Sequence, residues 1–169
     1  MRHILQGFTM YIDGSDFGYD TEEATLPIPT PVTQEYQGGG MDLKVSQPMA
    51  SLEAMEATIK MAGHNPDIMA KMAKWPGKTT LITLRGAVLS ESTGATDTHV
   101  CIMQGCPNAG SRDAWQRGEK SGLEFIINGM IYFRYTVNDR VIHSVRAWPP
   151  ERIVNEIDEL RDVNIALGY

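Results

Sequence analysis

The feature that most constrains this fold is a series of β-type segments in the second half of the chain, separated by turn signals. Four strands are predicted, rich in β-branched and aliphatic residues: 79–89, 96–103, 123–137 and 141–147. Ser92-Thr93-Gly94 is typical of a turn, and Asn138-Asp139 is typical of a two-residue hairpin. Strands joined by such short turns pair in antiparallel fashion. The sequence therefore predicts a mainly β fold, an antiparallel barrel or sandwich.

A long hairpin is predicted over about 25–60. Alternating prolines in 26–31 cannot donate to a central ladder, so this segment is expected to be an extended edge or connector. Gly38-Gly39-Gly40 is expected to form a flexible tip, with 41–49 returning as the partner strand. For 51–59 the pattern leaves helix and strand open, because the residues are good helix formers and the apolar positions fit either period.

A first short helix is predicted to start near residue 65. Asn65 is a typical N-cap and Pro66 suits the first helical position. Ile68, Met72 and Trp75 then follow at helical spacing and would form one apolar stripe.

Two further segments complete the predicted organisation. Residues 104–119 are polar and are expected to form a loop. A C-terminal helix is predicted over about 151–163, where Ile153, Ile157 and Leu160 share a helical face. The length of 169 residues fits one domain, 1–169, with one or two short helices beside the β structure.

The net charge of −6 is confined to the first third of the chain. Residues 1–60 hold nine acids and three bases, whereas the remainder balances at twelve of each. Tight nucleic-acid binding depends on many basic contacts to phosphates, so this class is disfavoured. No apolar stretch has the length of a membrane-spanning helix, and no secretory signal is recognisable. Synthesis in the cytosol is the expectation.

Metal-type ligands cluster at one place in the sequence, with His99, Cys101 and Cys106 near each other and His143 further on. In a strand His99 and Cys101 point to one side and Cys106 to the other, whereas a structural zinc site usually takes four ligands. A buried thiol and a strand-face imidazole are therefore favoured over a metal site. The two cysteines would lie about 16 Å apart in an extended strand, too far for a bond within the chain.

Catalytic and cofactor motifs are absent from the sequence. There is no nucleophile elbow, phosphate-binding loop or dinucleotide fingerprint. We therefore predict no catalytic residue, no cofactor and no metal.

Short motifs follow one another along nearly the whole chain. They are Thr25-Leu26-Pro27, the block from Gln34 to Asp42, the block from Leu52 to Ala57, Met103-x-Gly105, Gly118-Glu119-Lys120, Tyr132-Phe133-Arg134-x-Thr136 and Asn164-x-x-Leu167-Gly168. The Tyr-x-Gly-Gly-Gly-Met-Asp part is the most specific. In this order and spacing, the set resembles the family of major tail tube proteins of contractile-tailed phages and R-type pyocins. In that family the Leu52 to Ala57 block is strand.

The resemblance implies a small β-barrel or sandwich whose copies form a hexameric ring with a continuous inner β-barrel, and rings that stack into a tube inside a contractile sheath. A barrel of about 24 strands spaced by ~4.8 Å and tilted by ~40° has a backbone diameter near ~48 Å. Side chains leave a bore of roughly 38 Å, wider than a DNA duplex of about 20 Å. The implied function is that of a structural virion protein, not an enzyme, which conducts the genome into the bacterial host.

The resemblance also implies partners and a location. The partners are other copies of the chain, the tail sheath protein, baseplate and tail terminator proteins, a tape measure protein in the lumen, and DNA that passes without specific binding. The location is the tail of the virion, assembled in the host cytoplasm. One alternative is the tube of a phage-tail-like bacteriocin or of a type VI secretion apparatus. A remoter one is a small metal-binding β domain or enzyme using His99, Cys101 and His143.

Three groups of residues are candidates for contacts with other subunits. The hairpin tip is expected to reach a neighbouring subunit or ring through Tyr36, Gly38, Gly39, Gly40, Met41 and Asp42. Disulfides to another subunit or to the sheath are expected at Cys101 or Cys106, which do not belong to the family pattern. Sheath contact is expected at Glu156, Asp158 and Glu159. The acids of residues 1–60 are expected near the bore, where they would repel passing DNA.

Overall fold

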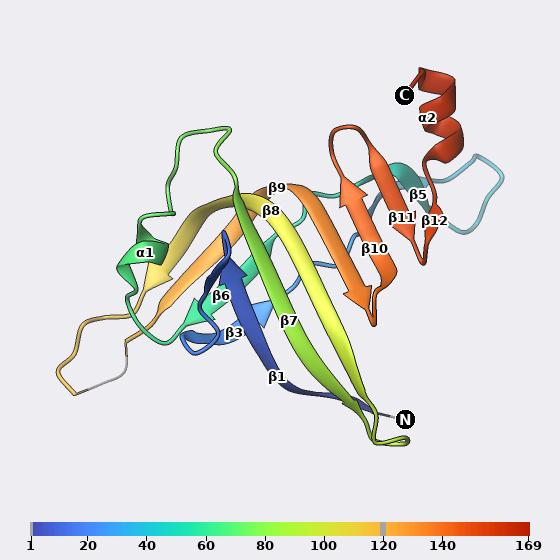
Figure 1. Ribbon diagram of the computed structural model, residues 1–169. Helices are drawn as coiled ribbons and strands as arrows, with labels where there is room; N and C mark the ends of the chain where they lie inside the picture. Colours follow the sequence, from blue (N-terminus) through green and yellow to red (C-terminus); the bar gives the residue numbers. More distant parts are fainter. Residues whose placement is uncertain (1, 119–120) are drawn as a thin grey trace.

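Ten strands form one antiparallel sheet in the computed structural model, which describes residues 2–118 and 121–169 (Figure 1). With the two strands of a separate hairpin, β4 and β5, the described residues contain β1 (His3–Ile12), β2 (Ser15–Asp16), β3 (Thr21–Thr25), β4 (Pro31–Tyr36), β5 (Val45–Leu52), β6 (Ala57–Met61), β7 (Thr80–Ser90), β8 (Thr96–Arg112), β9 (Leu123–Val137), β10 (Arg140–Arg146), β11 (Glu151–Val154) and β12 (Ile157–Asp158). The helices are α1 (Pro66–Met69) and α2 (Arg161–Leu167). The main path of the sheet is β12-β11-β10-β9-β8-β7-β1-β2. The predicted mainly β, antiparallel fold is confirmed.

Strand β9 divides the sheet into two regions. Its first part, residues 123–127, pairs with β6, and its second part, residues 132–137, pairs with β10, while β8 borders both parts. Because β6 also pairs with β3, the strands curve around one core (Figure 1). The largest fully buried side chains of this core include Met10, Ile59, Ile82, Met103, Phe125 and Phe133.

The four strands predicted in the second half of the chain are confirmed as β7 to β10. The β9–β10 turn has φ angles of 49° at Asn138 and 67° at Asp139, both positive as a type I′ turn requires. The β7–β8 turn contains Gly94 with a φ of 68°, a conformation that glycine adopts without steric cost.

No element is predicted over residues 3–12, which form β1. This strand pairs with β7 along its length. On its other side β2 pairs only with Tyr11 and Ile12. Among the described residues, no strand therefore pairs with the outer edge of β1 from residue 3 to residue 10.

The hairpin predicted over about 25–60 corresponds to one antiparallel pair within that range, and the strand at the end of the range pairs with a strand that precedes it. β4 pairs with β5 in a separate two-stranded sheet, and β3 pairs with β6. The segment 51–59 is strand at both ends, in β5 and β6, with irregular backbone over residues 53–56. It is not a helix.

Helix α1 begins where the sequence predicts but is only one turn long. The side-chain oxygen of Asn65 accepts a hydrogen bond from the Asp67 N–H at 3.0 Å, which caps the helix. Ile68 is buried, but the helix ends at Met69. The predicted apolar stripe therefore does not continue to Trp75, which is 79% exposed.

The helix predicted over 151–163 is wrong. β11, β12 and the turn between them occupy residues 151–158, and helix α2 begins only at Arg161, near the end of the predicted range. Ile153 and Val154 are β-branched and pair with β10, where such side chains fit a pleated surface. Asn155 and Glu156 have φ angles of 52° and 70° and form the turn between the two strands. Among the described residues, no helix is long and apolar enough to cross a membrane.

The loop predicted over 104–119 is wrong in its first half. β8 continues to Arg112, which lies opposite Leu123 of β9. The pairing is irregular around Pro107, where a residue without an N–H is tolerated. The last predicted loop residue, Glu119, and Lys120 of the Gly-Glu-Lys motif lie outside the described residues.

Candidate assembly surfaces

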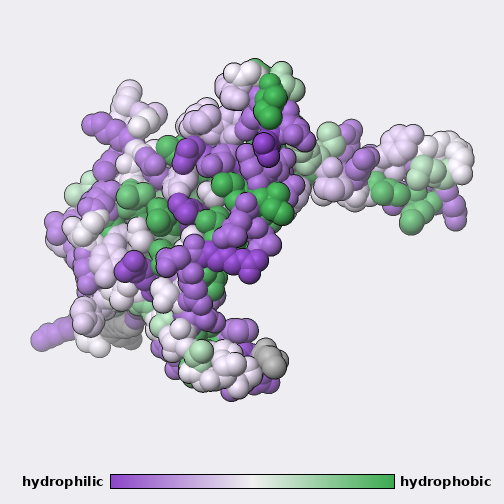
Figure 2. All heavy atoms as spheres, turned by 45° about the vertical axis from the view of Figure 1, so that its right-hand side comes forward, coloured by the Kyte–Doolittle hydropathy of each residue, from purple (hydrophilic) through white to green (hydrophobic). Residues whose placement is uncertain are grey.

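The β4–β5 hairpin forms an arm that projects from the body (Figures 1 and 2). Its exposed apolar side chains include Tyr36 at 61% exposure and Leu43 at 73%. The arm also touches the body, because the Arg152 guanidinium donates a hydrogen bond to the Ala50 carbonyl. Exposed apolar residues gathered on a projecting segment are typical of a surface that binds another protein.

The six predicted contact residues lie together at the tip of this arm. They are Tyr36, Gly38, Gly39, Gly40, Met41 and Asp42. The Met41 N–H donates to the Gly38 carbonyl at 2.9 Å, and the Gln37 amide donates to the Met41 carbonyl at 3.2 Å. Glu35 and Lys44 form an ion pair at the base of the tip. These contacts are internal to the arm, so the tip has its own shape independent of the body.

The two ends of the long sheet are further places where another subunit could bind. The outer edge of β1 exposes residues 3–10, and at the other end lies the two-residue strand β12. Leu5, on β1, is 54% exposed. Unpaired edges present backbone N–H and C=O groups to any strand that can join them. Sequence reasoning missed β1, although the alternating apolar residues Phe8, Met10 and Ile12 carry the strand period.

Both cysteines lie on β8 and are free thiols. Cys101 is 2% exposed, and burial raises the pKa of its thiol to about 12. It therefore stays protonated and unreactive at neutral pH. Cys106, expected in a loop, lies in the strand, and its thiol donates to the Lys78 carbonyl at 3.5 Å. Of the two, Cys106 is the one that another chain can reach.

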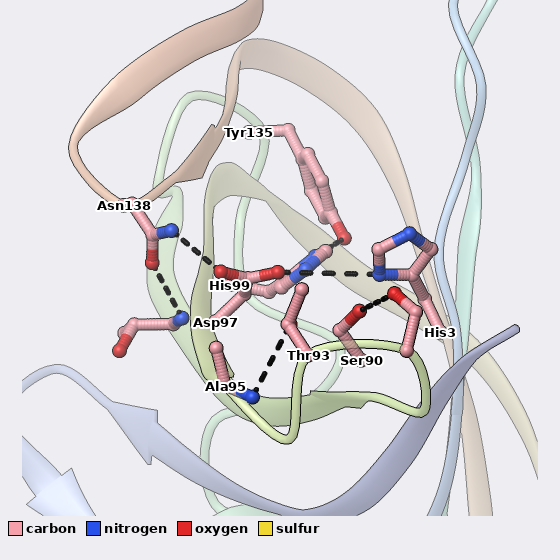
Figure 3. A network of polar contacts seen from close by, with 10 residues as sticks. His3, Ser90, Thr93, Ala95, Asp97, His99, Tyr135 and Asn138 are labelled. Atoms are coloured by element: carbon pink, nitrogen blue, oxygen red, sulfur yellow. Dashed lines mark hydrogen bonds and ion pairs between the residues drawn. The ribbon is translucent and has the colours of Figure 1, made fainter. Parts of the chain in front are cut away.

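The residues of the metal alternative lie on β8 and β10, on either side of β9. His99 Nδ1 lies 2.6 Å from the Tyr135 hydroxyl oxygen, and the two rings meet edge to face (Figure 3). Burial raises the pKa of Tyr135, and the neighbouring Cys101 adds to this shift. His143 lies opposite Tyr135 on β10. Within residues 2–118 and 121–169, no group of three or more His, Cys, Asp or Glu side chains is placed to hold a metal ion.

The three C-terminal acids do not share a helix face. Glu156 lies in the β11–β12 turn, and Asp158 lies in β12, where its carboxylate accepts a hydrogen bond from the Leu160 N–H at 3.0 Å. Glu159 follows directly, and all three acids are exposed. The expected acidic helix face is instead an acidic turn that leads into α2.

Helix α2 is a further surface that sequence reasoning missed, because the helix was expected earlier in the chain. It has no buried residue. Val163 is 49% exposed and Leu167 is 66% exposed. Asn164 attaches the helix to the body by donating to the Pro150 carbonyl at 2.8 Å.

Open strand edges, a projecting arm and an exposed apolar helix define the class of this protein as a subunit of a larger β assembly. The chain matches the family described as phage tail tube protein FII over residues 2–168, and it belongs to that family. It is thus a structural tail tube protein.

Solved structures with a similar fold come from an extracellular contractile injection system named PVC. A chain of its sheath-tube complex in the extended state is 9% identical, with a TM-score of 0.55 over 77% of this chain and 88% of that chain. A chain of its sheath/tube terminator in the extended state is 10% identical, with a TM-score of 0.53 over 78% and 93%. At such identities the similarity concerns the fold. No curated protein matches the chain.

Proposed function

We propose that this chain builds the inner tube of a contractile phage tail. Copies close into hexameric rings, the rings stack, and the bore conducts the genome into the bacterial host. The observation that carries this proposal is the open edge of β1, residues 3–10, at one end of a long antiparallel sheet in a member of a tail tube family.

Ring closure gives this edge a partner. A cyclic ring needs a heterologous contact, in which one surface of a subunit meets a different surface of the next. The sheet offers two different ends, β1 on one side and β10 to β12 on the other. Joining such ends around a ring produces a continuous barrel without edges, which removes the aggregation risk of a lone open sheet.

The charge of the bore depends on which segments face it. The acidic excess of the first 60 residues lies partly on β3 and on the arm, including Glu23, Glu35 and Asp42. The face of β7 and β9 that points away from the core instead carries Arg85 and Arg134, which alternate with buried residues. The acids repel passing DNA where β3 and the arm reach the bore.

The proposed partners follow from this role. Other copies of the chain supply the ring and the stack. The tail sheath protein surrounds the tube, a tail terminator and a baseplate close its ends, and a tape measure protein fills the lumen before DNA passes. The assembled tube belongs to the virion, and its subunits are made and assembled in the host cytoplasm.

A second candidate function keeps the same architecture without a genome. The similar solved structures belong to an injection system, which favours the tube of a bacteriocin or secretion apparatus as the alternative. Particles purified from producing cells distinguish the two, because only a phage tail is attached to a DNA-filled capsid.

The proposal is tested by electron microscopy of the concentrated protein in negative stain. We expect rings and stacked tubes with a repeat of about 40 Å, the size of one domain. Gln6→Pro is expected to prevent ring closure, because proline removes a donor from an edge strand. Gln6 lies at an irregularity in the β1–β7 register and has no Cα partner on β7, a kind of position where proline is tolerated, so this variant should still fold.

The matched control is Gln6→Ala, which keeps the backbone donor and should form rings. Wild-type protein that stays monomeric at every concentration would contradict the proposal. Normal rings from Gln6→Pro would contradict closure through β1.

The acidic turn before α2 gives a prediction about the sheath. The double variant Glu156→Lys and Glu159→Lys is expected to weaken sheath binding at least about tenfold, because it replaces attraction to a basic partner by repulsion. Tubes themselves should form normally. Sheath assembly on purified tubes, followed by co-sedimentation, measures the effect.

The control for this prediction carries the same charge change elsewhere. Glu91→Lys and Asp139→Lys lie in the β7–β8 and β9–β10 turns. Equal sheath binding by both double variants would show that the acidic turn is not the contact.

A further inference from the structure

An apolar cavity of about 320 Å³ opens on the core side of the sheet. Its apolar lining comes from β1, from β3 and the residue after it, and from β7 and β8, and includes Leu5, Phe8, Leu26, Leu84, Val88 and Cys101. Leu5 stands at its rim and is 54% exposed, whereas Leu84 and Cys101 at its base are buried. The cavity is an unfilled extension of the core that remains open to solvent.

Three polar residues of the lining, His3, His99 and Tyr135, take part in the polar contacts drawn in Figure 3. His99 and Tyr135 are joined by their hydrogen bond, and His3 Nδ1 lies 4.0 Å from an Asp97 carboxylate oxygen. Asp97 in turn accepts a hydrogen bond from Asn138 at 2.7 Å. None of the described residues that line the cavity is acidic. The lining thus combines an apolar floor with polar residues at its border, namely His3, Arg85, His99 and Tyr135.

Helix α2 carries a complementary surface. Val163 and Leu167 are four residues apart, so they lie on one side of the helix. Ile165, by contrast, lines a hollow against the chain's own Pro150. The helix ends at Leu167, and the Gly168 and Tyr169 N–H groups donate to the Ile165 and Asn164 carbonyls. The carbonyls of Ala166 and Leu167 have no such partner among the described residues and can accept hydrogen bonds.

The cavity and α2 lie at opposite ends of β10. This strand begins at Arg140, which lies opposite Val137 of β9, and Val137 in turn lies opposite the cavity residue His99 of β8. The cavity residue Tyr135 lies opposite His143, at the middle of β10. The strand ends at Arg146, which with Pro150 lines the hollow beside α2. Figure 1 shows the same separation, with α2 at the upper right and the N-terminus at the bottom near the β7–β8 turn. The helix of one copy is therefore directed away from its own cavity.

We propose that α2 of one copy docks in the apolar cavity of a second copy, with Val163 and Leu167 entering it. The inference rests on the proposed function, because it needs copies arranged head to tail. A contact between two different surfaces of a subunit repeats from copy to copy, and it gives an open filament where the rotation does not close into a ring, which is the geometry of a growing tube. The His3 and His99 imidazoles then lie near the carboxyl end of the docked helix, where a donor or cation is favourable.

The test uses the double variant Val163→Asp and Leu167→Asp. Because α2 has no buried residue, this variant should keep the wild-type melting temperature. We expect the protein concentration needed for tubes to rise at least about 30-fold, since two apolar side chains lose their burial. Electron microscopy and sedimentation velocity across a concentration series measure it.

A matched control and a rescue make the test specific. Asp162→Ala changes the same helix on a different side and should assemble like wild type. Leu5→Asp at the cavity rim should weaken assembly, and combining it with Leu167→Lys should restore assembly through an ion pair.

The possible outcomes distinguish failure of the α2 docking from failure of the proposed tube function. Loss of tubes in the aspartate double variant and recovery in the charge pair support the docking. Tubes that form at the wild-type concentration in the aspartate variant overturn the docking of α2. The same result is expected if a small apolar ligand fills the cavity instead. The cavity is at the low end of the size range of such ligand sites. If wild-type protein forms neither rings nor tubes, the proposed function itself fails.

Discussion

A variant in which Asn-Gly replaces residues 37–44 is expected to remain folded and to form no tubes. Tyr36 and Val45 lie directly opposite each other in the β4–β5 ladder, so a two-residue turn can join them without a register change. The tip's hydrogen bonds and ion pair are internal to the arm, and the arm is a separate two-stranded sheet. Removal of the tip should therefore change the melting temperature of the protein little.

The expected loss of assembly arises because the tip carries exposed apolar side chains, among them Leu43 at 73% exposure, on a segment that projects from the body (Figure 1). Electron microscopy of the variant against wild type at equal concentration measures it. Gly39→Ala is the matched control, because a Cβ there meets nothing within 4 Å, and it should form tubes. Gly39→Pro, which stiffens the same position, is expected to block polymerisation. Normal tubes from the Asn-Gly variant would show that the arm is not an assembly contact.

The strands from β7 to β10 could be predicted from sequence because their signals are local. Each is a long run of β-forming residues, and the turns between them are marked by their own chemistry, as at Asn138 and Asp139. Pairing between neighbours along the chain then follows without knowledge of the rest of the fold.

The C-terminal region could not be predicted in this way. Ile153, Ile157 and Leu160 have helical spacing, and only the ladder between β11 and β10 determines that Ile153 belongs to a strand. Pairing with a distant strand overrides local propensity. The positive φ angles at Asn155 and Glu156 complete a turn that the helical spacing conceals.

The candidate surfaces also differ in whether the local sequence is enough to identify them. The tip residues from Tyr36 to Asp42 form one continuous block, so a resemblance in sequence was enough to single them out. The open edge of β1 and the apolar cavity depend on which strands meet. Leu5, Leu84 and Cys101 share the cavity although they come from three strands. No local pattern contains that information.

The loop predicted over 104–119 is wrong in the second half of β8 because its glycine is interpreted as a loop residue. A substitution of this glycine is expected to lower the stability of the protein strongly. Gly110 is typical of a loop in sequence, but it lies in a strand that passes very close to β9. A Cβ at Gly110 would lie 2.4 Å from the Glu124 carbonyl oxygen, a backbone atom that cannot rotate away. Glycine is needed at position 110 because the backbones of β8 and β9 approach each other closely there. The wider range of φ angles that glycine can adopt is not the reason.

Gly110→Ala is accordingly expected to lower the free energy of unfolding by about 1–3 kcal/mol, the usual cost of overpacking. For a chain of this size the melting temperature should fall by roughly 2–12 °C. Thermal unfolding followed by circular dichroism measures this. Gly63→Ala, where a Cβ meets nothing within 4 Å, is the matched control and should leave the melting temperature nearly unchanged. Equal melting temperatures for the two variants would mean that β8 is not held against β9 at this point, and that residues 104–119 form a loop after all.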